Sequence, residues 1–423
     1  SGSPDPTMRE TTMAITRRAF NAGSLALVAA STIRVATAQT NQETTMLEIK
    51  PFRIDISDEA IADLKTRLGQ VRWPQPVTDD WTRGQPVALI KELAEQWRDT
   101  YDWRAHEAEL NRYPHFMTGI EGQPIHFVHV KSNEPNAFPL ILSHGWPGSF
   151  AELLSLVGPL TDPKAHGLDD AIAFDLVIPS LPGFGFSSPL IGPGWDSAKT
   201  AKAWDILMTG LGYERYGAHG GDAGALVGRE LGILAPKGLV GTHLQQIFAF
   251  PTGAEGEMEK LTPFEMEGMA NLASFEKYGG YQAIQSKRPA TLAFALVDSP
   301  VGQLAWNAEL WVGFEGQGAA LLDRELFLAT NSIYWFTGTS GSAANVYYED
   351  SQTGAGYREV PNPTPTGVAV FPNDFRSVRS FAERANNIVH WTEMPRGGHF
   401  AAVDAPDLLA EDIRKFFASL LAK

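Results

Sequence analysis

The sequence Gly220-Gly221-Asp222-Ala223-Gly224 decides the fold. It follows a predicted strand, Tyr216 to His219, and precedes a predicted helix, Ala225 to Leu234. Flanking glycines permit the cramped strand-to-helix turn that presents a central nucleophile at the edge of an α/β sheet. The central residue is Asp222. A carboxylate is already ionised at neutral pH, so it can attack an electrophilic carbon without a base and form an ester with it.

Predicted strands and helices alternate on both sides of this turn. Such alternation indicates a mostly parallel sheet with helices on both faces. The predicted strands are Ile125 to Val130, Leu140 to Ser143, Asp175 to Pro179, Gly367 to Phe371 and Asn387 to Thr392. The predicted helices include Ala151 to Leu160, Ala198 to Thr209 and Pro406 to Leu421.

Two largely helical stretches lie outside this alternation. Residues 47–113 show helical spacing of apolar residues, and residues 242–345 form a helical block rich in aromatic residues. We therefore predict an N-terminal domain at 47–113, a first core segment at 114–241, a lid at 242–345 and a second core segment at 346–423. A helical block inserted at this point indicates a lid over a site at the strand ends.

The segment His144 to Gly148 (HGWPG) directly follows the predicted strand Leu140 to Ser143. With a turn of this kind, the loop after that strand supplies one backbone N–H to an oxyanion hole, and the residue after the nucleophile supplies the other. The two predicted donors are the backbone N–H groups of Trp146 and Ala223. A plain Pro-Gly turn is the alternative interpretation of the segment.

The third motif is Arg396 to Phe400 (RGGHF), between the last predicted strand and the last predicted helix. His399 stands there as the candidate base, and Asp374, just after the preceding strand, can orient its imidazole. The chain order nucleophile, acid, histidine is that of the α/β-hydrolase fold. We predict this fold, with a helical lid and a mainly helical N-terminal extension. The less well placed rivals are His390 for the histidine and Glu383 and Glu393 for the acid.

With these motifs the chain resembles a microsomal-type epoxide hydrolase, from about Leu47 to the C-terminus. Further matches are Pro51 to Ile54, Arg72 to Pro74, Tyr101 to Trp103, Leu181 to Ser187 and Asp298 to Gly302. The resemblance implies that the N-terminal domain packs against the core and the lid. It also implies hydrolysis of an epoxide to a vicinal diol, through an ester on Asp222 that a water activated by His399 then hydrolyses.

The resemblance further implies two lid tyrosines that hold the epoxide oxygen. Tyr281 matches the first and Tyr347 the second, with Tyr348 as the competitor of Tyr347. A phenol suits this task because it donates a hydrogen bond to the oxygen and can protonate the alkoxide as the ring opens. The sequence departs from the family at Ala223, where Trp is common, and at Asp374, where many relatives have Glu. The first departure changes the shape of the pocket.

The amino-acid composition limits the kinds of partner and cofactor that we expect the protein to bind. A net charge of −15 argues against nucleic acid and anionic membrane surfaces. The chain has no cysteine, which excludes a thiolate nucleophile and disulfides. It carries no phosphate-binding, zinc or dinucleotide motif, so we expect no metal and no organic cofactor. The expected partners are a small apolar epoxide and water, and a homodimer stays open.

Two other classes of function stay open. A haloalkane dehalogenase uses the same aspartate turn but needs halide donors in place of the tyrosine pair, and halide release would identify it. A catalytically silent ligand-binding protein of this fold would have no need of Asp222, Asp374 and His399 together. The aspartate at the turn excludes a serine esterase.

The N-terminus predicts export. Ser1 to Thr7 resembles a vector-derived leader. Arg17-Arg18, an uncharged stretch from Asn21 to Ile33 and the triplet Ala36 to Ala38 together resemble a twin-arginine (Tat) signal peptide. We expect residues 1–46 to hold this leader, the signal and a polar linker, and the mature protein to lie in a bacterial periplasm. The uncharged stretch is too short to span a membrane.

Overall fold

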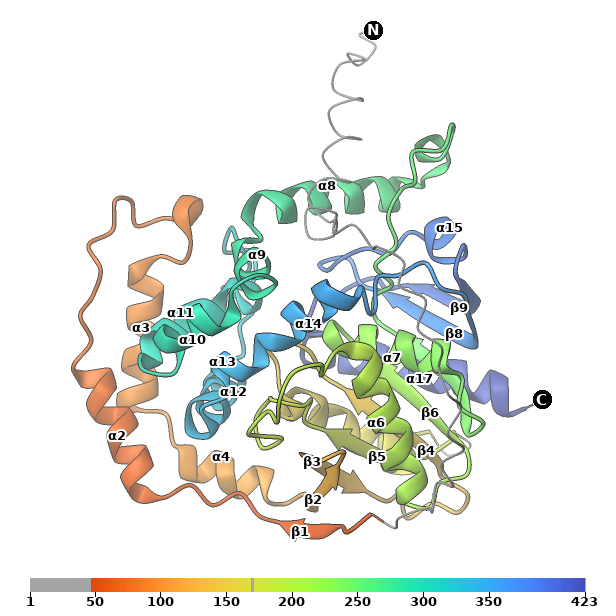
Figure 1. The fold of residues 1–423 in the computed structure, drawn as a ribbon, viewed down its shortest axis with the longest axis horizontal. Helices are drawn as coiled ribbons and strands as arrows, with labels where there is room; N and C mark the ends of the chain where they lie inside the picture. The colour runs from red at the N-terminus through yellow and green to blue at the C-terminus, as the bar shows by residue number, and fades with distance from the viewer. Residues whose placement is uncertain (1–46, 169–170, 423) are drawn as a thin grey trace, which may run out of the picture.

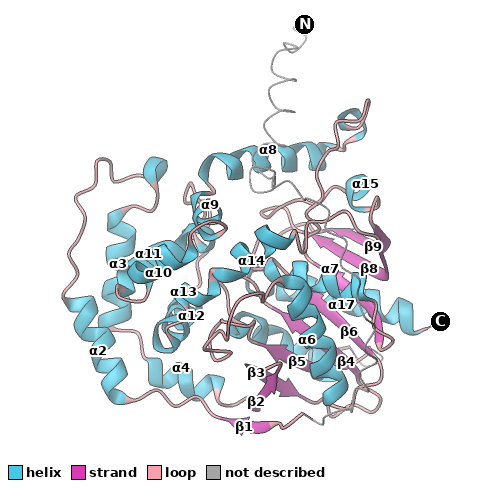
Figure 2. Ribbon diagram, viewed as in Figure 1, coloured by secondary structure: helices cyan, strands magenta, loops and turns pink. Residues whose placement is uncertain are grey.

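The computed structural model describes residues 47–168 and 171–422, and its centre is a nine-stranded mixed sheet (Figure 1, Figure 2). The strand order is β1-β2-β3-β5-β4-β6-β7-β8-β9. Their bounds are β1 Lys50–Phe52, β2 His115–Ile120, β3 Gln123–Val130, β4 Phe138–Ser143, β5 Phe174–Pro179, β6 Tyr216–Gly220, β7 Leu239–Leu244, β8 Asn362–Val370 and β9 Asn386–Glu393. The three pairs at the β1 edge are antiparallel and the other five are parallel. The predicted α/β fold with a mostly parallel sheet is confirmed.

Helices cover both faces of the sheet. Those of the core are η2 Phe150–Leu156, α5 Val157–Thr161, η3 Lys164–His166, α6 Ser197–Gly210, α7 Ala223–Leu234, α15 Arg379–Ala382, α16 Ala401–Asp404 and α17 Pro406–Leu421. Gly217 of β6 faces Phe417 of α17, since a Cβ there would come within 2.3 Å of the ring. The next residue, Ala218, lies in a buried cluster with Trp204 of α6 and Val227 of α7. Successive strand residues point to opposite faces, so α17 covers one face and α6 and α7 the other.

Some elements differ from the sequence-based prediction. The predicted strands of the sheet did not include β1, β2 or β7. Glycine, threonine and histidine dilute the apolar signal of β2 (HFMTGI) and β7 (LVGTHL), whose place is set by pairing with β3 and with β6 and β8. The predicted helix Ala151 to Leu160 is instead the 3-10 helix η2 followed by the short α5. Pro159 has no N–H for the carbonyl of Ser155, which removes one bond that a continuous α-helix would need.

The lid is the helical segment between β7 and β8. Its helices are η4 Met258–Lys260, α8 Pro263–Tyr278, α9 Gly280–Gln285, α10 Pro289–Leu296, α11 Pro300–Trp311, α12 Arg324–Thr337, α13 Ser340–Ala343 and α14 Asn345–Thr353. The boundary expected between residues 241 and 242 falls inside β7, and the boundary expected between 345 and 346 falls at the start of α14. The inserted segment therefore runs from 245 to 361, because strand pairing and not helical composition defines its ends.

The N-terminal helices lie against the lid (Figure 1). These are α2 Asp58–Gly69, η1 Trp81–Arg83, α3 Val87–Asp99 and α4 Trp103–Leu110. Helices α2 and α3 contact α11, and α4 contacts α12. The indole of Trp97 in α3 donates a 2.8 Å hydrogen bond to Ser332 in α12. Strand β1 adds the same N-terminal segment to the edge of the sheet through β2.

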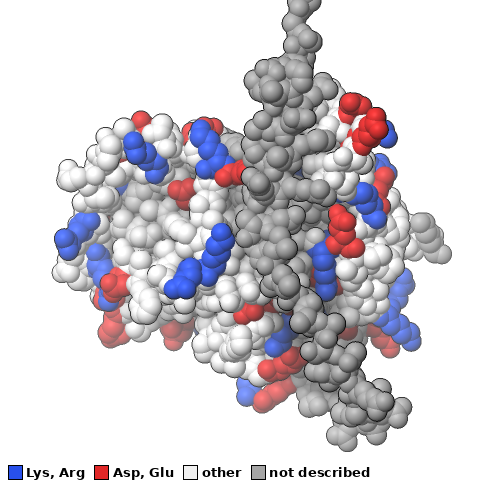
Figure 3. Space-filling model, turned by 45° about the horizontal axis from the view of Figure 1, so that its top comes forward, with Lys and Arg blue, Asp and Glu red and all other residues white. Residues whose placement is uncertain are grey.

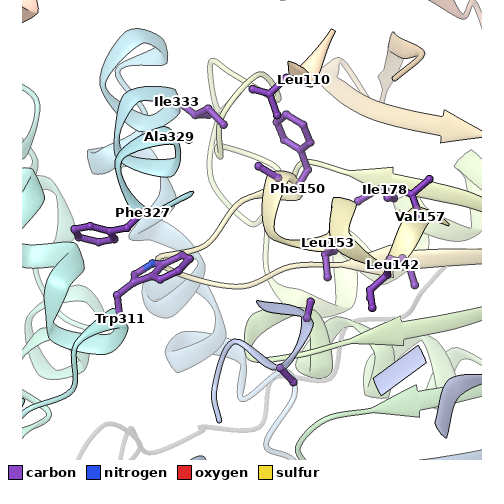
Figure 4. Packing of buried hydrophobic residues seen from close by; sticks show 14 of the residues in the cluster. Leu110, Leu142, Phe150, Leu153, Val157, Ile178, Trp311, Phe327, Ala329 and Ile333 are labelled. Carbon is purple, nitrogen blue, oxygen red and sulfur yellow. The ribbon is translucent and has the colours of Figure 1, made fainter. Parts of the chain in front are cut away.

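One buried apolar cluster joins the N-terminal helices, the lid and the core. Figure 4 shows Leu110 of α4, Trp311, Phe327 and Ile333 of the lid, and Phe150, Leu153 and Leu142 of the core in this cluster. Because the cluster is continuous, the lid helices that it includes are fixed to the sheet by burial of apolar surface.

The surface carries charges of both signs. On the face drawn in Figure 3, the visible Lys and Arg side chains are interspersed with Asp and Glu. No helix within 47–168 or 171–422 is both long enough and apolar enough to cross a bilayer. The leader, Tat-like signal and linker expected at residues 1–46 lie outside the described residues.

Candidate active site

Asp222 occupies the turn between β6 and α7 in a conformation that few residues adopt. Its φ is 53° and its ψ is −124°. A Cβ at Gly220 would lie 2.1 Å from the carbonyl oxygen of Gly224, and a Cβ at Gly224 would lie 2.2 Å from the carbonyl oxygen of Ser143. Only glycine fits at either position. The turn therefore projects the Asp222 carboxylate from the N-terminal end of α7, where the helix dipole favours a negative charge.

The two backbone N–H groups predicted as oxyanion donors both hydrogen-bond to the Asp222 carboxylate. The backbone N–H of Trp146 donates to Asp222 Oδ1 at 2.9 Å. The backbone N–H of Ala223 also hydrogen-bonds to this carboxylate and, with that of Trp146, favours its charged form. Oδ1 thus accepts the N–H of Trp146, and the other oxygen, Oδ2, lies 3.7 Å from His399 Nε2.

His399 and Asp374 form the second part of the site. Asp374 follows β8, and His399 lies in the loop between β9 and α16. The two loops meet in a bridge between Asn373 and Gly398. His399 Nδ1 lies 2.9 Å from Asp374 Oδ1, and His399 Nε2 lies 3.7 Å from Asp222 Oδ2. One ring nitrogen is therefore oriented by the acid while the other faces the nucleophile.

Burial and charge set the protonation of these groups. Burial alone would lower the pKa of His399, but the carboxylates of Asp374 and Asp222 outweigh it and raise that pKa to about 9. Burial would raise the pKa of Asp374, but His399 outweighs it and the pKa of this carboxyl is lowered. Burial raises the pKa of Asp222 above its ordinary value, against the opposing effect of His399 and the two N–H donors. The charged form of the His399 imidazole is therefore favoured by the two aspartates on either side of it.

Two glutamines directly after β7 hold Asp374 and the Asp222 turn in place. Neither was predicted from the sequence. Gln245 donates to Asp374 Oδ2 at 2.9 Å, and Gln246 donates to the same oxygen. The Oε1 atom of Gln246 accepts the backbone N–H of Asp222 at 2.8 Å. Gln246 thus connects the nucleophile turn to the acid. The signal that could have revealed them is a polar pair directly after a buried strand at the carboxyl edge of the sheet.

Two aromatic lid residues lie beside the oxyanion donor. Tyr281 of α9 stacks on the Trp146 ring with 4.9 Å between centroids, and Tyr347 of α14 meets both rings edge-on at 5.9 and 6.0 Å. Burial raises the pKa of both phenols well above the ordinary value, and the Asp222 carboxylate adds to the rise. Both phenols therefore remain protonated donors at neutral pH. Among the described residues, Tyr348 makes no ring contact with Trp146 or Tyr281, whereas Tyr347 contacts both.

The rival residues have other partners. His390 Nε2 lies 2.9 Å from Asp412, on the α17 side of the sheet. Glu383 accepts a 2.7 Å hydrogen bond from Arg379 on the surface of α15. Glu393 is exposed at the end of β9. Within the described part of the chain, no three His, Asp or Glu side chains gather in an arrangement that could hold a metal ion.

A cavity of about 970 Å³ opens beside the nucleophile, between the lid and the core. Asp222 and Ala223 line it. Much of the remaining wall is aromatic or aliphatic, from Leu226, Ile247, Phe248, Phe250, Leu272, Phe275, Val346, Tyr347, Tyr348 and Tyr357. Charged side chains, among them Arg229, Glu276 and Lys287, line it as well. A ligand pocket of this size accepts a sizeable molecule.

The fold is that of an α/β hydrolase, and it places the carboxylate of Asp222 at the turn that carries the nucleophile in such proteins. The family model described as "Epoxide hydrolase N terminus" matches residues 49–153. Epoxide hydrolase 1 of Sus scrofa is 34% identical over 88% of this chain and 89% of that protein. A protein of Stigmatella aurantiaca (strain DW4/3-1), provisionally named as an epoxide hydrolase, is 43% identical over 89% of this chain and 86% of that protein. This chain belongs to the microsomal-type epoxide hydrolase family.

Solved structures agree with this assignment. The Aspergillus niger epoxide hydrolase has a TM-score of 0.78 and 31% identity, over 89% of this chain and 98% of that chain. The juvenile hormone epoxide hydrolase of the silkworm Bombyx mori has a TM-score of 0.80 and 26% identity, over 90% of this chain and 96% of that chain. The matched portion therefore includes the N-terminal helices and the lid as well as the sheet.

Proposed function

We propose that the protein hydrolyses an apolar epoxide to a vicinal diol through an alkyl-enzyme ester on Asp222. The observation that carries this proposal is the position of His399. Its Nδ1 is 2.9 Å from Asp374 while its Nε2 faces Asp222 Oδ2 at 3.7 Å. A base in this position has no proton to take from a carboxylate, but it can activate a water against an ester formed on that carboxylate.

In the first step, Asp222 Oδ2 attacks one epoxide carbon and the bond from that carbon to the ring oxygen breaks. The buried phenols of Tyr281 and Tyr347 lie beside the nucleophile loop, and they donate hydrogen bonds to the ring oxygen. One phenol gives its proton to the alkoxide as it forms. Asp222 Oδ1 stays bound to the backbone N–H of Trp146.

In the second step, a water attacks the carbonyl carbon of the ester. The ester lacks the Asp222 charge that helps to raise the pKa of His399, so the imidazole gives its proton to solvent at this stage and regains it when Asp222 is again a carboxylate. His399 Nε2 then takes one proton from this water, while Asp374 stabilises the imidazolium. Negative charge develops on Oδ1, which already accepts the N–H of Trp146 and lies beside that of Ala223. Each such donor is typically worth ~3 kcal/mol in the transition state. The ester bond breaks, the imidazolium protonates the leaving diol oxygen, and the Asp222 proton returns to the phenolate through solvent.

Styrene oxide tests the proposal. Wild-type protein, Asp222→Ala and His399→Gln are exposed to it, diol is assayed, and the intact mass and the Asp222 peptide are measured. We expect diol from the wild type, a trapped adduct on Asp222 in His399→Gln, and neither in Asp222→Ala. Halide release from a chloroalkane is the control for dehalogenation. Halide release without diol, or diol without any Asp222 adduct in His399→Gln, would contradict the proposal.

A further inference from the structure

A second, much smaller cavity lies behind the nucleophile. Its volume is about 20 Å³. Glu152, Asp222 and His399 line it, with His219 and Gln245 beyond. Among the described residues, Asp222 is the one residue that lines both this small cavity and the large cavity of about 970 Å³. Asp222 therefore borders both a cavity large enough for a substrate and a cavity far too small for one.

The size and lining of the small cavity fit one water molecule. A volume of roughly 10–15 Å³ holds a single water, provided that two to four polar groups surround it. The carboxyl groups of Asp222 and Glu152 and the imidazole of His399 supply such groups. A water here meets His399 and the carboxyl of Asp222 in a space that shares no other described lining residue with the large cavity.

Glu152 is a buried carboxyl that has no role in the two steps proposed above. It lies on η2, directly after the loop that carries Trp146, and is 8% exposed. Its Oε2 accepts the backbone N–H of Ser149 at 3.3 Å. No described residue forms a hydrogen bond with its Oε1. Burial raises the pKa of Glu152 to about 8, against the opposing effect of His399. The carboxyl is therefore mostly neutral at neutral pH.

We propose that the small cavity holds the water that hydrolyses the Asp222 ester, and that Glu152 is a positioning residue that binds this water through Oε1. The role rests on the proposed function and adds a residue to its second step. Held by Glu152 and donating one proton to His399 Nε2, the water directs a lone pair at the ester carbon. The epoxide occupies the other side of Asp222, so substrate and water do not compete for one space.

A purely structural role for Glu152 is the alternative. Ser149 and Glu152 form a capping box at the start of η2, in which the Ser149 hydroxyl accepts the N–H of Ala151 at 3.3 Å. Loss of Glu152 could therefore act through the helix alone. Ser149→Ala is the matched control, because it weakens the same cap and leaves the Glu152 carboxyl in place.

The test separates ester formation from ester hydrolysis with styrene oxide. In Glu152→Leu, which has no oxygen for the water, we expect kcat and KM to fall together by between about 10- and 100-fold. The ratio kcat/KM, which reports ester formation, stays unchanged, and the Asp222 ester accumulates. Glu152→Gln keeps an oxygen for Ser149 and a donor for the water, and recovers most of the hydrolysis rate. Ser149→Ala loses stability but hydrolyses its ester at the wild-type rate.

Four results would overturn the role. One is ester hydrolysis at the wild-type rate in Glu152→Leu, and another is an equal loss in Ser149→Ala. A wild type that forms no Asp222 ester would overturn the proposed function itself, and this role with it. If Glu152→Leu does not fold, a high-resolution crystal structure of the wild-type protein decides. We expect an ordered water within hydrogen-bond distance of Glu152 Oε1 and His399 Nε2, and an empty cavity would refute the role.

Discussion

His399 Nε2 lies 3.7 Å from Asp222 Oδ2, too far for a hydrogen bond between them. In a serine hydrolase the base must touch the nucleophile to remove its proton. The proposed nucleophile, Asp222, is a carboxylic acid whose charged form needs no base in contact with it. In the proposed reaction, the spacing leaves His399 free to meet a water on the ester carbon. The two proposed steps therefore depend on different side chains, and substitutions should separate them.

Asp374→Asn should slow the second step and spare the first. The amide cannot stabilise the imidazolium, and it removes the negative charge that raises the pKa of His399. We expect ester hydrolysis to fall by roughly 10²–10⁴-fold, with the ester accumulating. Glu383→Gln is the matched control, because this rival acid pairs with Arg379 on the surface and should leave the rate near that of the wild type. Rapid-quench mass measurement follows both species.

The lid tyrosines should act in the first step alone. Tyr281→Phe and Tyr347→Phe each keep the ring contact with Trp146 but lose the phenol proton. We expect each to lower the rate of ester formation by about 10- to 100-fold, and the pair together to lose more than either. Tyr348→Phe serves as the control and should stay near wild type. A slowed hydrolysis of preformed ester in either single variant would refute this division of roles.

Ala223 should set the size of substrate that the enzyme accepts. Ala223 lines the large cavity, next to Asp222 in the chain. Ala223→Trp keeps the backbone N–H and fills this part of the cavity with an indole. We expect kcat/KM for a bulky disubstituted epoxide to fall at least about tenfold relative to that for a small terminal epoxide. An equal loss for both epoxides would indicate damage to the turn instead of a change in pocket size.

Stability should fall at alkaline pH because of His399. Its pKa in the folded protein is about 9, above the ordinary value of 6.5. A raised folded pKa means that the charged form stabilises the fold, fully below pH 6.5, and that this contribution is lost as the pH rises through about 9. We expect the wild type to lose of order 1–3 kcal/mol of unfolding free energy relative to His399→Gln between about pH 6 and about pH 10. Urea titrations measure the difference, and a flat difference would contradict the assigned pKa.

Local sequence patterns predicted much of the fold. The strands β4 and β5 are near-continuous apolar runs (FPLILS, FDLVIP), as expected for central strands buried on both faces. The strands β2 and β7 contain polar residues and glycine, and only pairing with their neighbours makes them strands. For the same reason the predicted lid began inside β7. A local sequence pattern does not reveal which strand from another part of the chain will pair with a segment.

Some residues of the candidate site could also be predicted from local motifs, and others could not. Asp222, Trp146, Asp374 and His399 lie in loops that follow strands, and such loops converge at one edge of a parallel sheet. Their positions could be read from local motifs. Gln246 and Glu152 could not, because their importance lies in contacts across the fold: Gln246 reaches Asp374, and Glu152 lines a cavity with His399. Tyr281 and Tyr347 were predicted only through the family resemblance, since lid aromatics are common packing residues.

The most direct test of the account is a single turnover in water labelled with oxygen-18, with enzyme in excess over styrene oxide. If a water attacks the ester carbonyl, the label enters the Asp222 carboxylate and the diol carries none. The account predicts a heavier Asp222 peptide and an unlabelled diol. A labelled diol with an unlabelled Asp222 would mean that water attacks the epoxide directly, and would contradict the alkyl-enzyme ester.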